Sequence, residues 1–228
     1  MTKYFIFGIE LKTRDKILLK AKKAFNDVGF SAISLFELAG SVGISRGNLT
    51  YHFKDKDILL EAIADEMWHK IETERTKSRQ FPSFENLHNE VQLYYKFQRE
   101  YAFIFTDVHV LNHPKIKAQF RKMAKQTIAD NEATIAFSIK IGNMKPESFA
   151  GLYHNLAFIA WLIAFFWLTQ QKIRGTESNQ DGEKMIWSIL LPHFTDKGIQ
   201  SFKSYFGEDY YNNIGQPFKV DIDQIIPF

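Results

Sequence analysis

The sequence predicts an all-α protein, with an N-terminal three-helix domain that contains a helix-turn-helix and a C-terminal helical domain. Apolar residues recur at three- and four-residue spacing along most of the chain. No stretch alternates apolar and polar residues over the length of a strand. Residues 34–53 carry two sets of helix start signals separated by a glycine, the pattern of two short helices joined by a tight turn.

The composition of the 228 residues is that of an ordinary globular protein with many aromatic side chains. Hydrophobic residues make up 45%, charged residues 24% and aromatic residues 15%. The chain has no cysteine, which excludes disulfide scaffolds, thiolate zinc sites and cysteine catalysis. This composition is consistent with a cytoplasmic protein.

The first helix is expected at residues 10–28. Ile17, Ala21 and Phe25 lie on its apolar stripe, and Gly29 follows as a stop signal. Its lysines are expected on a solvated face. This helix would support the two that follow.

Residues 34–53 predict a helix-turn-helix. Ser34 and Glu37 have the spacing of a capping box, in which each side chain bonds the other residue's backbone N–H. Gly43 supplies the backbone freedom that ends the first helix, and Ser45 is placed to cap the second. Leu49 is expected to face the core.

The outer face of the second helix is the candidate DNA surface, because the second helix of such a motif enters the major groove. An ordinary helical hairpin with no ligand would show the same local features. The residues expected on this outer face are Arg46, Gly47, Asn48, Thr50, Tyr51 and His52.

The amino-acid sequence of about residues 11–63 resembles that of the tetracycline-repressor (TetR) family of bacterial transcription regulators. The residues that carry the resemblance are Thr13, Arg14, Ile17, Leu18, Ala21, Phe25, Gly29, Phe30, Ile33, Ser34, Leu38, Ala39, Gly43–Ile44–Ser45–Arg46–Gly47, Leu49, His52–Phe53–Lys54, Lys56, Leu59 and Leu60. The resemblance implies a homodimeric DNA-binding regulator, with repression as the usual mode. The family usually has a tyrosine directly after the leucine, where this chain has Thr50 followed by Tyr51.

Individual DNA contacts follow from side-chain chemistry. Arg46 is the candidate for guanine and Asn48 for adenine, while Thr50 or Tyr51 would meet a methyl group or a phosphate. The residues expected to position the backbone of the DNA are Ser34, Ser45, His52 and Lys56.

The charge distribution supports a DNA-binding N-terminal domain at residues 1–60. This segment holds ten Lys/Arg and six Asp/Glu, for a net charge of +4, whereas the whole chain carries +3. Two such modestly basic modules in a dimer would add their attraction for double-stranded DNA. Effector binding and dimerisation are assigned to residues 61–207, and residues 208–228 are expected to form an irregular tail.

Further helices are expected at residues 55–79, 83–112, 114–141, 145–172, 184–191 and 195–206, with Pro192 breaking or kinking the chain between the last two. Residues 156–168 are thirteen consecutive apolar residues. A membrane span needs about 20, so a buried helix is favoured over a span. A helix that is apolar on all sides is expected to be buried on all sides. Because one protomer would bury only one face, the sequence predicts a homodimer whose interface is formed by residues 146–172 and 183–206.

The aromatic C-terminal domain predicts a pocket for a small apolar or aromatic effector whose binding releases a palindromic operator. The alternative is a helix-turn-helix regulator controlled by a protein partner or by no ligand. No catalytic motif is present, so no enzyme activity and no cofactor are expected. Asp107, His109 and His113 lack a further ligand, and no metal site is expected. The candidate effector contacts are Tyr101, Phe105, His109, Phe137, His154, Phe158, Trp161 and Phe165.

Overall fold

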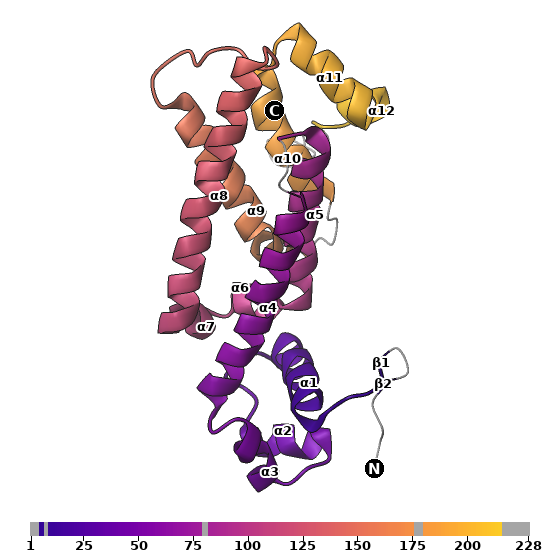
Figure 1. Cartoon of the computed structure of the whole chain (residues 1–228), viewed down its shortest axis with the longest axis vertical. Coiled ribbons are helices and arrows are strands. Elements are labelled where there is room, and N and C mark those ends of the chain that lie inside the picture. Colours follow the sequence, from indigo (N-terminus) through magenta and orange to yellow (C-terminus); the bar gives the residue numbers. More distant parts are fainter. Residues whose placement is uncertain (1–4, 7–8, 79–81, 176–179, 216–228) are drawn as a thin grey trace, which may run out of the picture. The chain divides into compact units, whose positions relative to one another are not determined.

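The computed structural model describes residues 5–6, 9–78, 82–175 and 180–215. The regular elements of its described part are helices, as the sequence predicts, apart from one pair of two-residue strands and an isolated bridge between Met144 and Phe194 (Figure 1). The chain forms two compact units. The first comprises Met1–Lys77 and Lys96–Lys122, and the second comprises Ser78–Tyr95 and Met123–Phe228.

The first unit begins with a short hairpin that the sequence did not predict. Strand β1 (Phe5–Ile6) pairs antiparallel with β2 (Ile9–Glu10). Two-residue strands are too short to produce a recognisable alternation. The pairing holds Ile9 and Glu10 extended, so helix α1 spans Thr13–Val28 and does not start at residue 10.

Three helices after α1 complete the N-terminal part of this unit: α2 (Leu35–Val42), α3 (Arg46–His52) and α4 (Lys56–Ser78). Helix α1 packs on α2, and α2 packs on α3. The shared core is made of residues that the helical periodicity places inside, which are Ile17, Ala21, Phe25, Leu38, Leu49, Phe53, Leu59 and Ile63.

The helix expected over residues 83–112 is divided in three: α5 (Phe84–Glu100), α6 (Ala102–Thr106) and α7 (Val108–Asn112). Tyr101 and Asp107 have non-helical backbone angles at the two breaks. At the second break, the Asp107 side chain accepts from His109 N at 2.9 Å and from Phe30 N at 3.2 Å. This tertiary contact with the segment after α1 explains a break that the local sequence does not signal.

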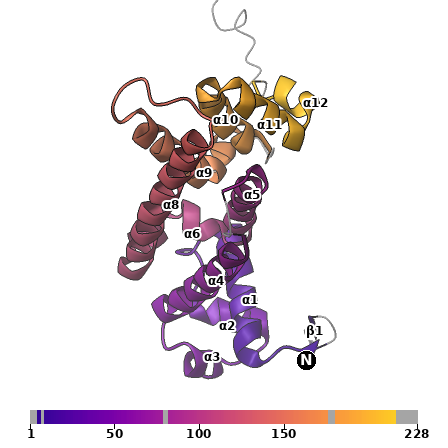
Figure 2. The ribbon, with the colours of Figure 1, turned by 45° about the horizontal axis from the view of Figure 1, so that its top comes forward.

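The second unit contains α5 up to Tyr95 and α8 (Pro114–Lys140) from Met123 onward. It also contains α9 (Leu152–Arg174) and α10 (Gln180–Leu190). Helix α9 packs on α10 (Figure 2). Helix α9 starts at Leu152, later than the predicted residue 145. The reason is that Lys145 N donates to His193 O at 2.9 Å in an extended connection, and Gly151 then takes a left-handed conformation with φ of 88°.

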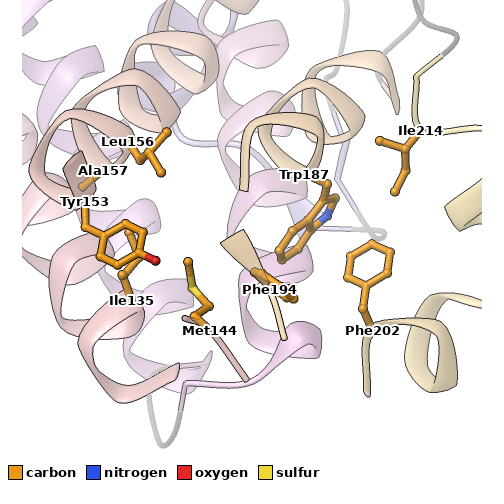
Figure 3. Close-up of a cluster of buried hydrophobic side chains, with 9 residues drawn as sticks. All are labelled: Ile135, Met144, Tyr153, Leu156, Ala157, Trp187, Phe194, Phe202 and Ile214. Atoms are coloured by element: carbon orange, nitrogen blue, oxygen red, sulfur yellow. The ribbon is translucent and has the colours of Figure 1, made fainter. Parts of the chain in front are cut away.

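A 3₁₀ turn at Leu191–His193 confirms the predicted break at Pro192, and it leads to α11 (Asp196–Phe206) and α12 (Glu208–Asn212). The expectation of an irregular segment from residue 208 is therefore wrong for α12, although residues 216–228 lie outside the described residues. Helix α12 forms because its aromatic side chains pack on the core: the Tyr210 ring stacks on Phe206 at 4.7 Å. The core cluster of this unit, drawn in Figure 3, comprises Ile135, Met144, Tyr153, Leu156, Ala157, Trp187, Phe194, Phe202 and Ile214.

Candidate nucleic-acid interface and effector cavity

The turn between α2 and α3 has the geometry that the sequence predicts. Glu37 N donates to Ser34 Oγ at 3.2 Å, and Ser34 N donates to Glu37 Oε2 at 2.8 Å, which completes the capping box. Gly43 ends α2 with φ of 79°. Ser45 Oγ accepts from Asn48 N at 3.1 Å and caps α3. Both serine oxygens are thus engaged in ordering the two helices.

The outer face of α3 is open to solvent. Arg46, Gly47 and Asn48 are exposed, and Tyr51 is 85% exposed. Leu49 on the opposite side is fully buried, so the helix presents this outer face in a fixed orientation. One guanidinium (Arg46), one amide (Asn48) and one phenol (Tyr51) are therefore accessible on this face to a large ligand.

Thr50 and Tyr51 differ in how free their hydroxyls are. The Thr50 hydroxyl is 3.1 Å from both Arg46 O and Gly47 O, so its proton is used inside the helix. The Tyr51 ring stands away from the core and contacts the half-buried His52 ring edge-on at 5.3 Å. Of these neighbours, Tyr51 has the hydroxyl better placed to reach outward.

Lys56 is held more tightly than a surface lysine. Its Nζ lies 4.4 Å from the centre of the Phe30 ring and 5.7 Å from that of Phe25. Burial lowers the pKa of Lys56, while the nearby carboxylates of Asp107 and Asp57 act in the opposite direction. The ammonium group thus stabilises the packing of the first unit as well as carrying charge, a role that sequence reasoning missed.

Polar contacts tie α1 to the segment that joins α5 and α6. Lys22 Nζ contacts Glu100 Oε1 at 2.6 Å. Burial by itself would raise the pKa of Glu100, but the hydrogen bond and charge of Lys22, together with the charge of Lys70 and a hydrogen bond from Tyr101, lower it. Asn26 bonds the backbone on either side of Tyr101. Helix α1 is consequently anchored to the end of α5 within the same unit.

The second unit contains a cavity of about 80 Å³ between α5, α8, α9 and α10. Three alanines on one side of α9, Ala157, Ala160 and Ala164, leave room where larger side chains would fill the space. The lining residues are Leu87, Glu90, Val91, Tyr94, Thr127, Asn131, Thr134, Ile135, Leu156, Ala157, Ala160, Trp161, Ala164, Glu183, Ile186, Trp187 and Leu190. The site is mainly apolar with a few polar groups, the usual character of a small-molecule pocket.

Glu183 is the most deeply buried polar group of the cavity wall, at 2% exposure. Its carboxylate receives hydrogen bonds from Gln92 Nε2 at 3.0 Å and Trp187 Nε1 at 3.1 Å, and His88 Nδ1 lies 2.8 Å away. These contacts fix the carboxylate and link α5 to α10. Nothing in the local sequence around Glu183 distinguishes it from a solvent-exposed glutamate of an amphipathic helix.

Of the eight predicted effector contacts, Trp161 lines the cavity and the other seven do not. Tyr101, Phe105 and His109 belong to the first unit. There Tyr101 Oη donates to Glu66 at 3.0 Å, Phe105 packs edge-on against Phe120, and His109 is exposed. In the second unit, Phe165 stacks on Trp161 with ring centres 5.4 Å apart but does not itself line the cavity. Phe137 is half-buried elsewhere, and Phe158 is exposed. His154 is also exposed and contacts Glu132.

Helix α9 keeps part of its apolar surface exposed. The exposed fraction is 41% for Phe158, 45% for Phe166 and 81% for Ile173. The helix is long and apolar enough to cross a membrane by length and composition, with 33% of its most apolar window buried. Its other face is part of the core of the second unit, through buried residues such as Leu156 and Trp167.

Two family models match the chain. The model described as bacterial regulatory proteins of the tetR family matches residues 17–63, and the TetR model described as a bacterial transcriptional repressor matches residues 56–202. Among curated proteins, the chain is similar to the HTH-type transcriptional regulator QacR of Staphylococcus aureus, with 29% identity over 147 residues that cover 60% of this chain and 74% of QacR. Other curated regulators match over only 24–29% of their own length.

Solved structures share the fold. A TetR-family transcriptional regulator from Marinobacter aquaeolei VT8 superposes with a TM-score of 0.76 and 23% identity, covering 88% of this chain and 99% of that one. AibR, solved in complex with isovaleryl coenzyme A and operator DNA, superposes with a TM-score of 0.60 and 19% identity, covering 80% of this chain and 100% of AibR.

Proposed function

This chain belongs to the TetR family of bacterial transcriptional regulators, and we propose that it is a homodimeric repressor that binds a palindromic operator and is released by a small effector. Members of this family are DNA-binding regulators and not enzymes. The capped helix α3, with its open outer face, is the observation that carries the proposal. A cytoplasmic location is proposed on the same grounds.

We propose that α3 reads bases through Arg46 and Asn48. An arginine can bond guanine O6 and N7 together, and an asparagine can do the same with adenine N6 and N7. Tyr51 takes the phosphate contact, because its hydroxyl is free to leave the helix whereas that of Thr50 is bonded to α3 itself. Gly47 allows close approach of the backbone, and His52 borders the contact.

Ser34, Ser45 and Lys56 act mainly by holding these groups in place. The serine oxygens cap α2 and α3, and the Lys56 ammonium lies over Phe30. Their influence on DNA affinity is therefore expected to come through the order of the two helices, in addition to any contact of Lys56 with a phosphate. Residues 1–60 remain the proposed DNA-binding domain.

Two copies of α3 are needed to enter successive major grooves about 34 Å apart. We propose that α9 and α10, which overlap the predicted segments 146–172 and 183–206, form the dimer interface. The exposed Phe158, Phe166 and Ile173 on α9 are apolar groups that a second copy would cover. A two-fold contact of this kind places the same helix face on both partners.

Control by an effector is supported by the cavity in the second unit. A ligand that needs more room than about 80 Å³ would favour a wider arrangement of α5, α8, α9 and α10. A ligand shifts such an equilibrium only by its difference in affinity for the two arrangements. The alternative, control by a protein partner or by no ligand, predicts that filling this cavity leaves regulation unchanged.

The test is selection of bound DNA from a random pool by the full-length protein, with and without a small-molecule extract of the host cell. A two-fold symmetric motif with half-site centres 10–10.5 base pairs apart, or a multiple of that, is expected. The extract is expected to reduce recovery of that motif. Enrichment of a single asymmetric half-site would count against the homodimer, and unchanged recovery would favour the alternative mode of control.

A further inference from the structure

We propose that an exposed basic row on α8 binds the phosphate backbone of the DNA that flanks the operator, outside the base pairs read by α3. This α8 row consists of Lys117, Arg121 and Lys122. The inference rests on the operator binding proposed above and adds a second DNA contact to it.

The charge of this part of the sequence is the first reason. Residues 108–129 contain five Lys/Arg and no Asp/Glu, so their net charge of +5 exceeds the +4 of the whole segment 1–60. The three side chains of the α8 row are all exposed. The chain therefore carries a second concentration of positive charge, separate in sequence from the helix-turn-helix.

The cations of the α8 row are not neutralised within the described part of the chain. Lys117 Nζ lies 3.5 Å from Asn112 Oδ1, which is a neutral acceptor. Arg121 and Lys122 have no carboxylate partner among the described residues. Their charge is thus available to an anion that the protein itself does not supply.

The carboxylates that α4 presents to the start of α8 are already used by other side chains. Lys115 Nζ lies 3.2 Å from Glu61 Oε2 and 2.8 Å from Asp65 Oδ2. Gln119 Nε2 donates to Asp65 Oδ1 at 3.2 Å. The outward-facing α8 row therefore keeps its positive potential.

The local stability of α8 opposes this arrangement of charge. Lys117 and Arg121 are four residues apart on one helix, where like charges repel. The first turn of α8 contains no acidic residue, so nothing there complements the helix dipole. The helix is held instead by the buried Ile116 and Phe120 on its opposite face. Rules of local stability that are broken in this way are typical of functional sites.

The character of the surface selects phosphate as the anion. Among the described residues, none of the exposed large apolar side chains lies on α8. The centre of a protein interface is rich in apolar and aromatic groups, and a helix that lies on a membrane turns an apolar face to the lipid. Lys and Arg alone are sufficient for contacts with a phosphodiester backbone. The α8 row therefore fits DNA better than a protein or a membrane.

The position of the row favours DNA that is continuous with the operator. Helix α3 ends at His52 and α4 begins at Lys56. Lys115, just before the row, contacts α4 at Asp65, which lies about 14 Å along α4 from its start. These groups all belong to the first unit. DNA that continues from the site held by α3 is tethered near the row, so its effective concentration exceeds that of a separate duplex.

The test compares two duplexes in binding to the full-length protein. One ends at the edges of the selected operator, and the other continues for about 20 base pairs on each side, or about 68 Å at 3.4 Å per base pair. Fluorescence anisotropy measures both affinities at about 50 and about 200 mM salt, a range over which phosphate contacts weaken strongly.

We expect the longer duplex to bind on the order of tenfold more tightly at the lower salt concentration, and this advantage to disappear at the higher one. One additional phosphate contact from each protomer of a dimer makes the salt dependence steeper by about two powers of the salt concentration, which gives roughly that factor. Equal affinity for the two duplexes at low salt would overturn the proposal and favour an acidic protein as the partner of the row.

Variants assign the length advantage to the α8 row. Lys117→Gln/Arg121→Gln should reduce the advantage to less than about threefold and leave binding of the short duplex unchanged. If this variant does not fold, Arg121→Gln alone should reduce the advantage in part. Lys140→Gln/Lys145→Gln removes the same charge at exposed positions of the second unit and should keep the full advantage. Equal weakening of both duplexes by Lys117→Gln/Arg121→Gln would place the row on the operator itself and contradict the assignment.

A separate duplex distinguishes flanking DNA from a second DNA molecule. The complex with the short operator duplex is mixed with a free duplex of the flanking sequence. Capture of this free duplex, lost in Lys117→Gln/Arg121→Gln, would show that the row holds another DNA molecule and would overturn the assignment to the flank. Failure of the short duplex to bind would count against the proposed function, whereas tight binding of it without a length advantage counts only against the α8 contact.

Discussion

The side chain of Asn26 in α1 joins the backbone of Glu100 to that of Phe103. Its Nδ2 donates to Glu100 O at 2.9 Å, and its Oδ1 accepts from Phe103 N at 3.1 Å. The break at Tyr101, between α5 and α6, frees these two backbone groups from a continuous helix, and one amide side chain satisfies both. Helix α1 is thereby attached to α5 and α6.

Replacing Asn26 by Ala should destabilise the protein by about 1–3 kcal/mol, because two part-buried backbone groups lose their partner. Urea unfolding of the variant measures this change. Asn89→Ala, at an exposed position of α5, is the matched control and should change stability by less than about 0.5 kcal/mol. Equal effects at the two positions would show that the bridge contributes little.

Arg46→Ala should cost about 1–3 kcal/mol of binding to the selected operator and relax the preference at one base pair of each half-site. The reason is that Arg46 is exposed on α3 and has the donors that guanine accepts. Selection from a random pool checks this by comparing base preferences of the variant and the original protein. An unchanged preference at every position would exclude Arg46 from base reading.

Tyr51→Phe should weaken binding to the operator and to unrelated DNA by a similar factor, because the exposed phenol hydroxyl is assigned to a phosphate. The salt dependence of binding should stay the same, since no charge is removed. Thr50→Val removes a hydroxyl that is bonded within α3 and should have the smaller effect. Fluorescence anisotropy with both DNAs measures the two variants, and a larger effect of Thr50→Val would reverse the assignment.

Lys56→Ala should lower the midpoint of thermal unfolding as well as weaken binding on all sequences. Its ammonium lies 4.4 Å from the centre of the Phe30 ring, so the substitution removes packing in addition to charge. Lys54→Ala removes the same charge at an exposed position and should leave the unfolding midpoint unchanged. Differential scanning fluorimetry separates the outcomes, and equal midpoints would confine Lys56 to an electrostatic role.

Phe166→Glu should convert the dimer into monomers at micromolar concentration and abolish tight operator binding. A carboxylate would be buried without a partner where two copies of α9 meet. Phe149→Glu makes the same change at an apolar residue that is also exposed, at 58%, but lies before α9. Sedimentation equilibrium measures the mass of each variant; a dimeric Phe166→Glu protein would place the interface elsewhere.

The sequence by itself determined the helix-turn-helix. The capping box of Ser34 and Glu37, the left-handed Gly43 and the cap at Ser45 depend on groups only a few residues apart, so their sequence signals are local. Helical periodicity likewise identified the buried side of α1. The break at Pro192 was predictable because proline lacks the N–H that a continuing helix requires.

Tertiary structure decided the features that depend on residues far apart in the chain. Asp107 ends α6 and starts α7, and its side chain also accepts a hydrogen bond from Phe30 N. The ammonium group of Lys56 lies over the ring of Phe30, which precedes α2 in the sequence. Residues 156–168 are apolar on every side, so no periodicity could separate the buried face of α9 from the exposed one. The cavity belongs to no single helix, because its space arises where side chains from four helices fail to meet, and only their packing determines which residues line it.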